Sequence, residues 1–173
     1  MKKIFVILLA FGLFACQDDD EGGSINQTDI DLVTGIDLRQ TITSPSIRLG
    51  NPNSFNTGIA LTPNPNLGTL IVTSTLNVSD IWLIAAEADK VFQDVDFREL
   101  YTADPYEESE VVRMADLSLN DLNGFEINVN MESLDEGYYR IFIKADGTLY
   151  WDNVYKGGTD LDINALMDFW SQE

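Results

Sequence analysis

The side chains that could carry chemistry in this chain are almost all carboxylates. The sequence holds 29 aspartate and glutamate residues against 10 lysine and arginine residues, one cysteine and no histidine. Without histidine there is no Ser-His-Asp or Cys-His catalysis and no imidazole-ligated metal. Paired carboxylates can hydrolyse glycosidic bonds, but with 29 acids some pair always lies close, so pairing alone singles out no residue. We therefore predict a non-enzymatic protein with no catalytic residue, no metal site and no cofactor.

Two acidic segments could bind calcium. Residues 160–164 have the spacing of the first half of a calcium-binding loop, but Ala165 stands where the loop needs glycine and Ser171 where it needs glutamate. The favoured interpretation is that one residue of this segment caps a helix. The candidates for the cap are Thr159, Asp160 and Asp162. A second acidic group that could form a weak surface site after folding is Glu107, Glu108 and Glu110.

An aromatic cluster near the end of the chain offers a different chemistry. Aromatic faces stack on sugar rings, so Tyr150, Trp151 and Tyr155, with Tyr138 nearby, could contact a glycan. Alternation along a strand puts Trp151 and Tyr155 on one side and Tyr150 on the other, so some of these side chains must belong to the core. Glycan binding is therefore the alternative function.

The charge of the chain limits its partners. A formal net charge of −19 argues against nucleic acid, because phosphates are neutralised by lysine and arginine. A length of 173 residues fits one ordinary domain with short appendages, and an apolar content of 45% is enough to fill a core. One cysteine forms neither an internal disulfide nor a thiolate zinc site.

The N-terminus is typical of an export signal. Lys2 and Lys3 precede an apolar run over residues 4–15, which is shorter than the roughly 20 residues that span a bilayer as a helix. The run ends at Cys16, and residues 13–16 resemble the lipobox of bacterial lipoproteins, in which the cysteine is acylated after cleavage. We therefore expect residues 1–15 to be removed, Cys16 to carry the lipid anchor and residues 16–30 to form an acidic flexible tether.

The residues after this cysteine suggest a signal that determines the location of the protein. They are similar to the acidic export signal of Bacteroidota lipoproteins, which implies display on the outer face of the outer membrane. The residues of this run are Gln17, Asp18, Asp19, Asp20 and Glu21. A repelling spacer beside anionic headgroups is a compatible interpretation.

The rest of the sequence predicts mainly strands, and these strands would position the side chains of any functional site. We expect an N-terminal segment at 31–57 with a strand at 36–42, a β-sandwich at 58–157 and a helical tail at 158–173. Alternating or β-branched residues predict sandwich strands at 67–76, 81–85, 90–95, 125–131, 139–143 and 148–151. Asn77 predicts a turn, and Asp146-Gly147 predicts a hairpin. Residues 105–108 are either a loop or the start of a short helix, and 110–119 favour a strand.

In the C-terminal tail, residues 158–173, the spacing of the apolar residues changes from that of a strand to that of a helix. Its apolar residues recur at i, i+3, i+4 and i+7, which predicts one buried face of a short helix. These residues are Ile163, Leu166, Met167 and Trp170. Such a short helix is marginal alone in water, so we expect it to pack on the sandwich.

Two motifs carry a resemblance to known folds. Asp135, Gly137 and Tyr139 form the Asp-x-Gly-x-Tyr pattern of the tyrosine corner, which implies an immunoglobulin-like antiparallel sandwich of about seven strands, with the Tyr139 hydroxyl bonded to the backbone. Trp82 stands where such folds often have a core tryptophan.

The second motif is Pro63-Asn64-Pro65 followed by Gly68. With the strand and Gly-x-Tyr turn further on, it resembles the C-terminal sorting domain of type IX secretion cargo in Bacteroidota, over residues 59–156. A sorting domain normally follows a large cargo domain and ends the chain, whereas this chain has a helical tail. The resemblance therefore implies the fold and not the sorting role.

These inferences give one leading function. We expect a surface lipoprotein that contacts an outer-membrane protein, as an accessory subunit of a secretion, gliding or uptake complex. Its membrane contact would be made through the lipid anchor.

Overall fold

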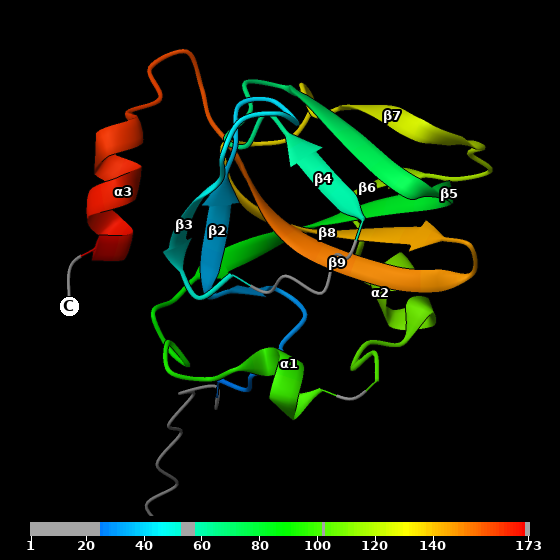
Figure 1. Ribbon diagram of the computed structural model, residues 1–173, viewed down its shortest axis with the longest axis horizontal. Coiled ribbons are helices and arrows are strands. Elements are labelled where there is room, and N and C mark those ends of the chain that lie inside the picture. Colours follow the sequence, from blue (N-terminus) through cyan, green and yellow to red (C-terminus); the bar gives the residue numbers. More distant parts are fainter. Residues whose placement is uncertain (1–24, 53–57, 102, 172–173) are drawn as a thin grey trace, which may run out of the picture.

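One long strand, β5 (Thr69–Ala88), organises the fold in the computed structural model, which describes residues 25–52, 58–101 and 103–171 (Figure 1). The first half of β5 pairs antiparallel with β4 and β7, and its second half pairs antiparallel with β6 and β8. A hairpin then joins β8 to β9. The remaining bounds are β4 (Ile59–Thr62), β6 (Leu117–Leu119), β7 (Gly124–Asn130), β8 (Gly137–Ala145) and β9 (Thr148–Lys156).

The main hydrophobic core lies between the two halves of this strand system. Leu70 from the first half of β5 and Val129 of β7 belong to the same buried cluster as Leu83 from the second half and Ile141 of β8. Burial of apolar side chains between two layers of strands is the packing of a β-sandwich. The predicted all-β sandwich with a short C-terminal helix is confirmed.

The N-terminal segment packs on the outer face of the β8–β9 layer. The strand β1 (Leu32–Val33) runs parallel to the end of β5, and β2 (Gly35–Leu38) pairs with β3 (Ile47–Gly50) in a separate two-stranded sheet. The Asn153 side chain of β9 donates a hydrogen bond to the Gly35 carbonyl oxygen at 2.8 Å. Residues 31–52 thus contribute buried side chains to the domain and do not form a separate appendage.

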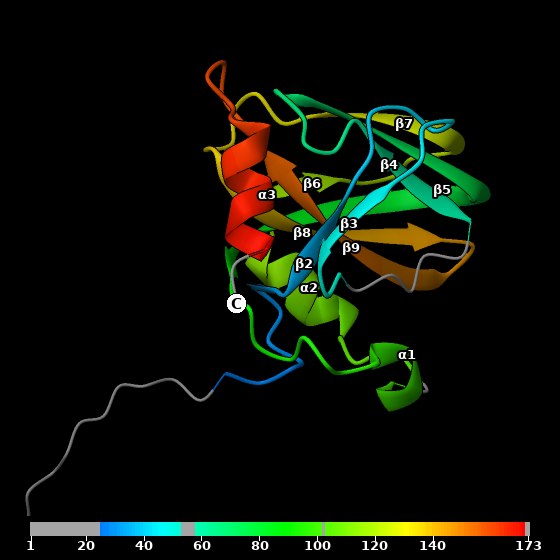
Figure 2. The ribbon, with the colours of Figure 1, turned by 60° about the vertical axis from the view of Figure 1, so that its left-hand side comes forward.

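The described residues also form three short helices, which are shown from a second side in Figure 2. They are α1 (Phe97–Leu100), α2 (Glu108–Met114) and α3 (Ile163–Ser171). Val111 of α2 is buried beside Trp82 on the outer face of the sheet, so Trp82 is a core residue of that face and not of the inter-layer core.

The C-terminal helix α3 buries only part of the predicted face, because Ile163 is 40% exposed. Leu166 and Trp170 pack with residues of β2 and β3 in one cluster. The Asp162 carboxylate accepts hydrogen bonds from the backbone N–H groups of Asn164 at 2.9 Å and Ala165 at 3.2 Å. Asp162 is therefore the helix cap among the three candidates.

The expected turn at Asn77 is wrong, because residue 77 lies inside the continuous strand β5. The pairing with β7 shifts register between Thr73 and Val78, and the pairing with β8 shifts between Val78 and Asp80. The irregularity that asparagine favours is thus absorbed by bulges where β5 changes partners, and the chain does not reverse.

Two further strand predictions are wrong. Residues 90–95 form no strand, since 91–94 form a turn with Phe92 at a φ of +60°, and they pair with no described strand. Residues 108–114 form α2, and only Leu117–Leu119 of the expected strand 110–119 is β6. An alternating sequence does not form a strand at 90–95 without a neighbouring strand to pair with. At 108–114 the apolar side chain of Val111 is buried from a helix instead of from a strand.

Candidate functional site

The three aromatic residues predicted to contact a ligand do not form one platform. Trp151 is only 2% exposed, with the Tyr106 ring 5.2 Å away and the Arg140 guanidinium 4.6 Å from its ring centre. Tyr150 packs against the inter-layer core on the opposite face of β9. Trp151 is therefore mainly a core residue, although it borders, with Tyr150, a separate cavity of about 220 Å³, and a ligand contact there stays a prediction.

Tyr155 lies instead in a cavity of about 360 Å³ between β8, β9 and α3. We call it the tyrosine cavity and define it by Glu136, Tyr138, Tyr155, Asp160, Asp162 and Phe169. The rings of Tyr138 and Tyr155 meet edge to face at 4.8 Å. Burial raises the pKa of Tyr138 to about 12, so its hydroxyl stays protonated at neutral pH. Aromatic rings beside carboxylates could hold a polyhydroxyl ligand. Among the residues of this cavity, Phe169 was not a candidate from the sequence.

A fully buried arginine, Arg140, which was not among the sequence candidates, ties the N-terminal segment to the sheet. The Arg140 guanidinium donates hydrogen bonds to the carbonyl oxygens of Asp29 (3.2 Å) and Leu32, and to the Tyr106 hydroxyl. Its Nε donates to the Asn153 amide oxygen at 3.4 Å. Burial lowers the pKa of Arg140, and the Tyr106 hydroxyl opposes this shift. The network serves structure, because its partners are buried groups of the fold.

The Pro63-Asn64-Pro65 motif connects three parts of the chain. The Asn64 amide nitrogen donates hydrogen bonds to the carbonyl oxygens of Asp37 (2.9 Å) and Asn153 (3.0 Å). The Asn64 amide oxygen accepts one from the Tyr155 backbone N–H at 3.0 Å. The motif therefore holds the end of β2 against β9, which gives it a structural role in this fold.

Beside this motif lies a broad apolar depression with a volume of about 990 Å³. We call it the Arg39 groove and define it by Leu38, Arg39, Ile47, Leu67, Leu161 and Ile163. It lies between the β2–β3 hairpin, the loop that leads into β5 and the segment before α3. Leu67 is 66% exposed, Ile47 51% and Ile163 40%. Large exposed aliphatic side chains in one depression mark an interaction surface.

The charge in this groove is opposite to that of the chain. Arg39 is the one charged residue among those that line it, and none of them is a carboxylate. No ion pair joins Arg39 to a carboxylate within the described ranges. The nearby Asp37 has a pKa raised by burial, although Arg48, Arg39 and Arg98 act to lower it. The groove is thus apolar with one cation, in a chain with a net charge of −19.

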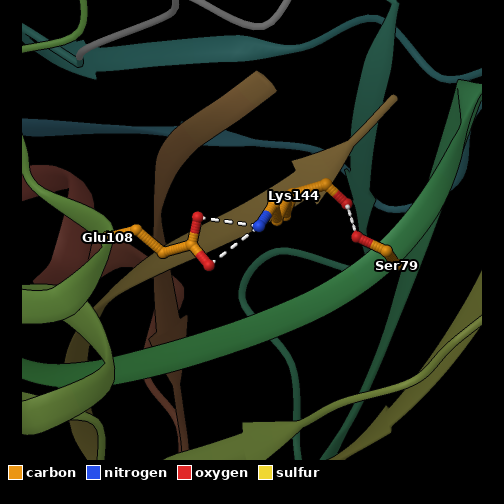
Figure 3. A network of polar contacts seen from close by, with 3 residues as sticks. All are labelled: Ser79, Glu108 and Lys144. Carbon is orange, nitrogen blue, oxygen red and sulfur yellow. Dashed lines mark hydrogen bonds and ion pairs between the residues drawn. The ribbon is translucent and has the colours of Figure 1, made fainter. Parts of the chain in front are cut away.

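Two of the acidic residues at 107–110 pair with cations of the fold. Both carboxylate oxygens of Glu108 lie 2.8 Å from the Lys144 ammonium, and the Ser79 hydroxyl donates to the Lys144 carbonyl oxygen at 3.3 Å (Figure 3). Glu110 lies 3.6 Å from Arg113 on the same helix. Among the described residues, no three Asp, Glu or Cys side chains converge as a metal site would need.

The hydrogen bond expected at the tyrosine corner is present. The Tyr139 hydroxyl donates to the Asp135 carbonyl oxygen at 2.9 Å, and Gly137 between them has a φ of +151°, which favours glycine. The Asp-x-Gly-x-Tyr pattern therefore describes a real local structure at the start of β8.

Replacing Tyr139 with phenylalanine should lower the free energy of unfolding by about 1 kcal/mol, the net value of one hydrogen bond. Urea denaturation measures it. The control is Tyr150→Phe, because the Tyr150 hydroxyl makes no hydrogen bond to any residue the structure describes. Equal losses in the two variants would contradict a role for the Tyr139 hydroxyl.

Comparisons with protein-family models, with curated proteins and with solved structures find no match for this chain. The similarity to type IX sorting domains therefore stays a prediction from the motifs. Cys16 and the acidic run from Gln17 to Glu21 lie outside the described residues. Within the described ranges, no helix is long and apolar enough to cross a membrane.

Proposed function

We propose that this chain is a non-enzymatic lipoprotein of the outer-membrane surface and serves as an interaction subunit of a secretion, gliding or uptake complex. The anchor would be Cys16, and the acidic run after it would direct display on the outer face. The support for this location comes from the sequence, where a basic start and a short apolar run lead to a cysteine followed by acids.

The observation that carries the interaction role is the Arg39 groove. The first described residues lie at the end of the molecule that carries α1, whereas the β2–β3 loop and the segment before α3 lie at the opposite end in both views (Figures 1 and 2). An anchor that precedes residue 25 would therefore leave the groove at the end facing away from its attachment. That arrangement suits contact with a partner.

Replacing Cys16 with alanine should release the protein from membranes, because acyl chains supply the anchoring at roughly 0.8 kcal/mol per buried CH₂. Cell fractionation with immunoblotting measures the shift from the membrane to the soluble fraction. In parallel, protease added to intact cells should degrade the wild-type protein. Continued acylation of the variant, or full protection of the wild type in intact cells, would count against the proposed location.

Affinity capture of the wild-type chain from detergent-solubilised membranes tests the function itself. A stoichiometric outer-membrane barrel protein supports the interaction role. The tyrosine cavity favours the second candidate, a glycan-binding lipoprotein, since it combines aromatic rings with carboxylates. Absence of a stoichiometric partner, together with retardation of the purified protein in a polysaccharide gel, would favour glycan binding over the interaction role.

A further inference from the structure

We propose that the Arg39 groove binds an extended segment of a partner protein that brings aliphatic side chains and one carboxylate. This inference rests on the proposed role as an interaction subunit and names the chemistry of the partner. It is drawn from the shape, the apolar surface and the charge of the groove.

The apolar surface gives the first part of the partner's chemistry. Ile47, Leu67 and Ile163 come from three segments far apart in the sequence, yet they border one depression. Together they expose aliphatic surface that burial would remove from water, at roughly 25 cal/mol per Å². A segment with aliphatic side chains would fill this depression.

The charge gives the second part. No carboxylate lines the groove, although the chain contains 29 acidic residues, so an acidic partner would contact no carboxylate of the groove lining. Arg39 lines the groove and forms no ion pair with any described carboxylate, and its Nε atom is itself covered by the fold, so the terminal nitrogens of the guanidinium are the groups offered to a partner. A guanidinium recognises a carboxylate through charge-assisted hydrogen bonds. The complementary group on the partner is therefore a carboxylate.

The backbone holds Arg39 in place for such a contact. The Arg39 N–H donates to the Asn64 carbonyl oxygen at 2.7 Å, and the Asn64 N–H donates to the Arg39 carbonyl oxygen at 2.7 Å. Asn64 is itself buried and bonded to β2 and β9. A cation on a fixed backbone loses less freedom when it binds, which favours specific recognition.

The openness of the groove favours a protein segment over a small amphiphile. Sites for small ligands enclose most of the ligand surface, but Ile47, Leu67 and Ile163 are 40% to 66% exposed. A single acyl chain laid along such side chains would remain wet on one side. A segment that belongs to a folded partner is covered on that side by its own protein.

Two matched peptide libraries test the inference directly. Both contain ten-residue peptides with aliphatic residues at alternate positions, one with a single glutamate and the other with glutamine in its place. The protein is the chain from residue 16 onwards with Cys16→Ser, so that no acyl chain is present. We expect glutamate peptides to bind about tenfold more tightly than their glutamine counterparts, on the scale of a charged hydrogen bond.

Three variants assign that binding to the groove. Leu67→Glu should weaken binding of both libraries about tenfold or more, since it buries a charge in the contact. Arg39→Gln should bind glutamate and glutamine peptides equally. Phe125→Glu is the matched control, because Phe125 is 58% exposed on β7 and does not line the groove.

Several results would overturn the inference. They are no binding of either library, equal binding by the Leu67→Glu variant, and a preference for glutamate that persists without Arg39. Self-association of the wild-type chain that Leu67→Glu abolishes would identify a second copy as the occupant. Flotation with phosphatidylethanolamine vesicles that Leu67→Glu abolishes would identify lipid. Either of these two results would also overturn it.

Capture from membranes separates this inference from the function on which it rests. If Leu67→Glu retains the stoichiometric partner of the wild type, the interaction role stands and the groove is not its docking site. If the wild type captures no partner, the interaction role itself fails. Loss of the partner in Leu67→Glu but not in Phe125→Glu supports both.

Discussion

Replacement of Arg140 by methionine is expected to lower the free energy of unfolding by about 3 kcal/mol or more, the scale of two or three buried acceptors left without donors. Methionine fills a similar volume in the apolar surroundings but donates no hydrogen bond. The carbonyl oxygens of Asp29 and Leu32 and the amide oxygen of Asn153 would lose their guanidinium donor.

The size of this effect follows from the kind of partner that Arg140 has. A buried ion pair can often be replaced by apolar residues at little cost when both charges are removed. The partners of Arg140 are instead backbone carbonyls, a phenol and an amide, and the carbonyls cannot be removed. The carbonyl groups lose their contacts with water on folding whether or not the guanidinium is present. Removing the guanidinium would therefore leave the free energy of their desolvation uncompensated.

Urea denaturation monitored by tryptophan fluorescence measures the loss. The matched control is Lys144→Met, four residues further along β8, where the ammonium pairs at the surface with Glu108 (Figure 3). Surface pairs contribute little, so this variant should lose much less. A second readout is hydrogen exchange at residues 29–33, which should increase in Arg140→Met alone. Equal stability of the two variants would contradict the role given to the guanidinium.

Local patterns in the sequence predicted the parts of the fold that local physics determines. Residues 125–131 alternate cleanly, and β7 covers Gly124–Asn130, while the hairpin at Asp146-Gly147 joins β8 to β9. Asp146 has a φ of +47° and Gly147 one of +81°, the conformation that this dipeptide favours. The period of the C-terminal tail likewise predicted α3, because one apolar face had to be buried.

The failures come from non-local partners. Asn77 signals an irregular backbone, and an irregularity occurs there, but pairing on both sides continues β5 through it. Residues 90–95 alternate as a strand would, yet no neighbouring strand receives them among the described residues. Strand formation depends on a partner edge, which a single sequence does not reveal.

The candidate site likewise has features that the sequence predicted and features that it did not. The Asp-x-Gly-x-Tyr motif was found from the sequence because it acts through a backbone group only four residues away. Pro63-Asn64-Pro65 was found from its residue pattern, but its partners Asp37, Asn153 and Tyr155 were not, because they lie 27 to 91 positions away. The Arg39 groove was missed, since its apolar residues come from segments up to 125 positions apart in a chain of 173 residues, from Leu38 to Ile163. The signal for Arg140 was a lone cation in an otherwise apolar strand, Tyr139 to Ile143, which is unusual unless the cation is paired.

Replacing Asn64 with alanine is the second change with a large expected effect, about 3 kcal/mol of unfolding free energy for three buried hydrogen bonds. The two donations, to Asp37 and Asn153, and the acceptance from the Tyr155 N–H all disappear together. The control Asn128→Ala removes the same side chain from an exposed position on β7 and should change stability by less than about 0.5 kcal/mol.

An aspartate at position 64 tests whether the Asn64 amide nitrogen donates hydrogen bonds to Asp37 and Asn153. Asn64→Asp keeps an acceptor for the Tyr155 N–H but faces two carbonyl oxygens with a carboxylate, which raises the carboxyl pKa in the folded state. A raised folded pKa means that the folded state binds the proton more tightly. The stability of Asn64→Asp should therefore be greatest below the unfolded pKa of about 3.9 and fall as the pH rises through the folded pKa. Urea midpoints of Asn64→Asp and Asn64→Ala between pH 3.5 and 7 measure this difference. If Asn64→Asp matches the wild type at neutral pH, the amide does not donate to Asp37 and Asn153, and the motif does not hold β2 against β9.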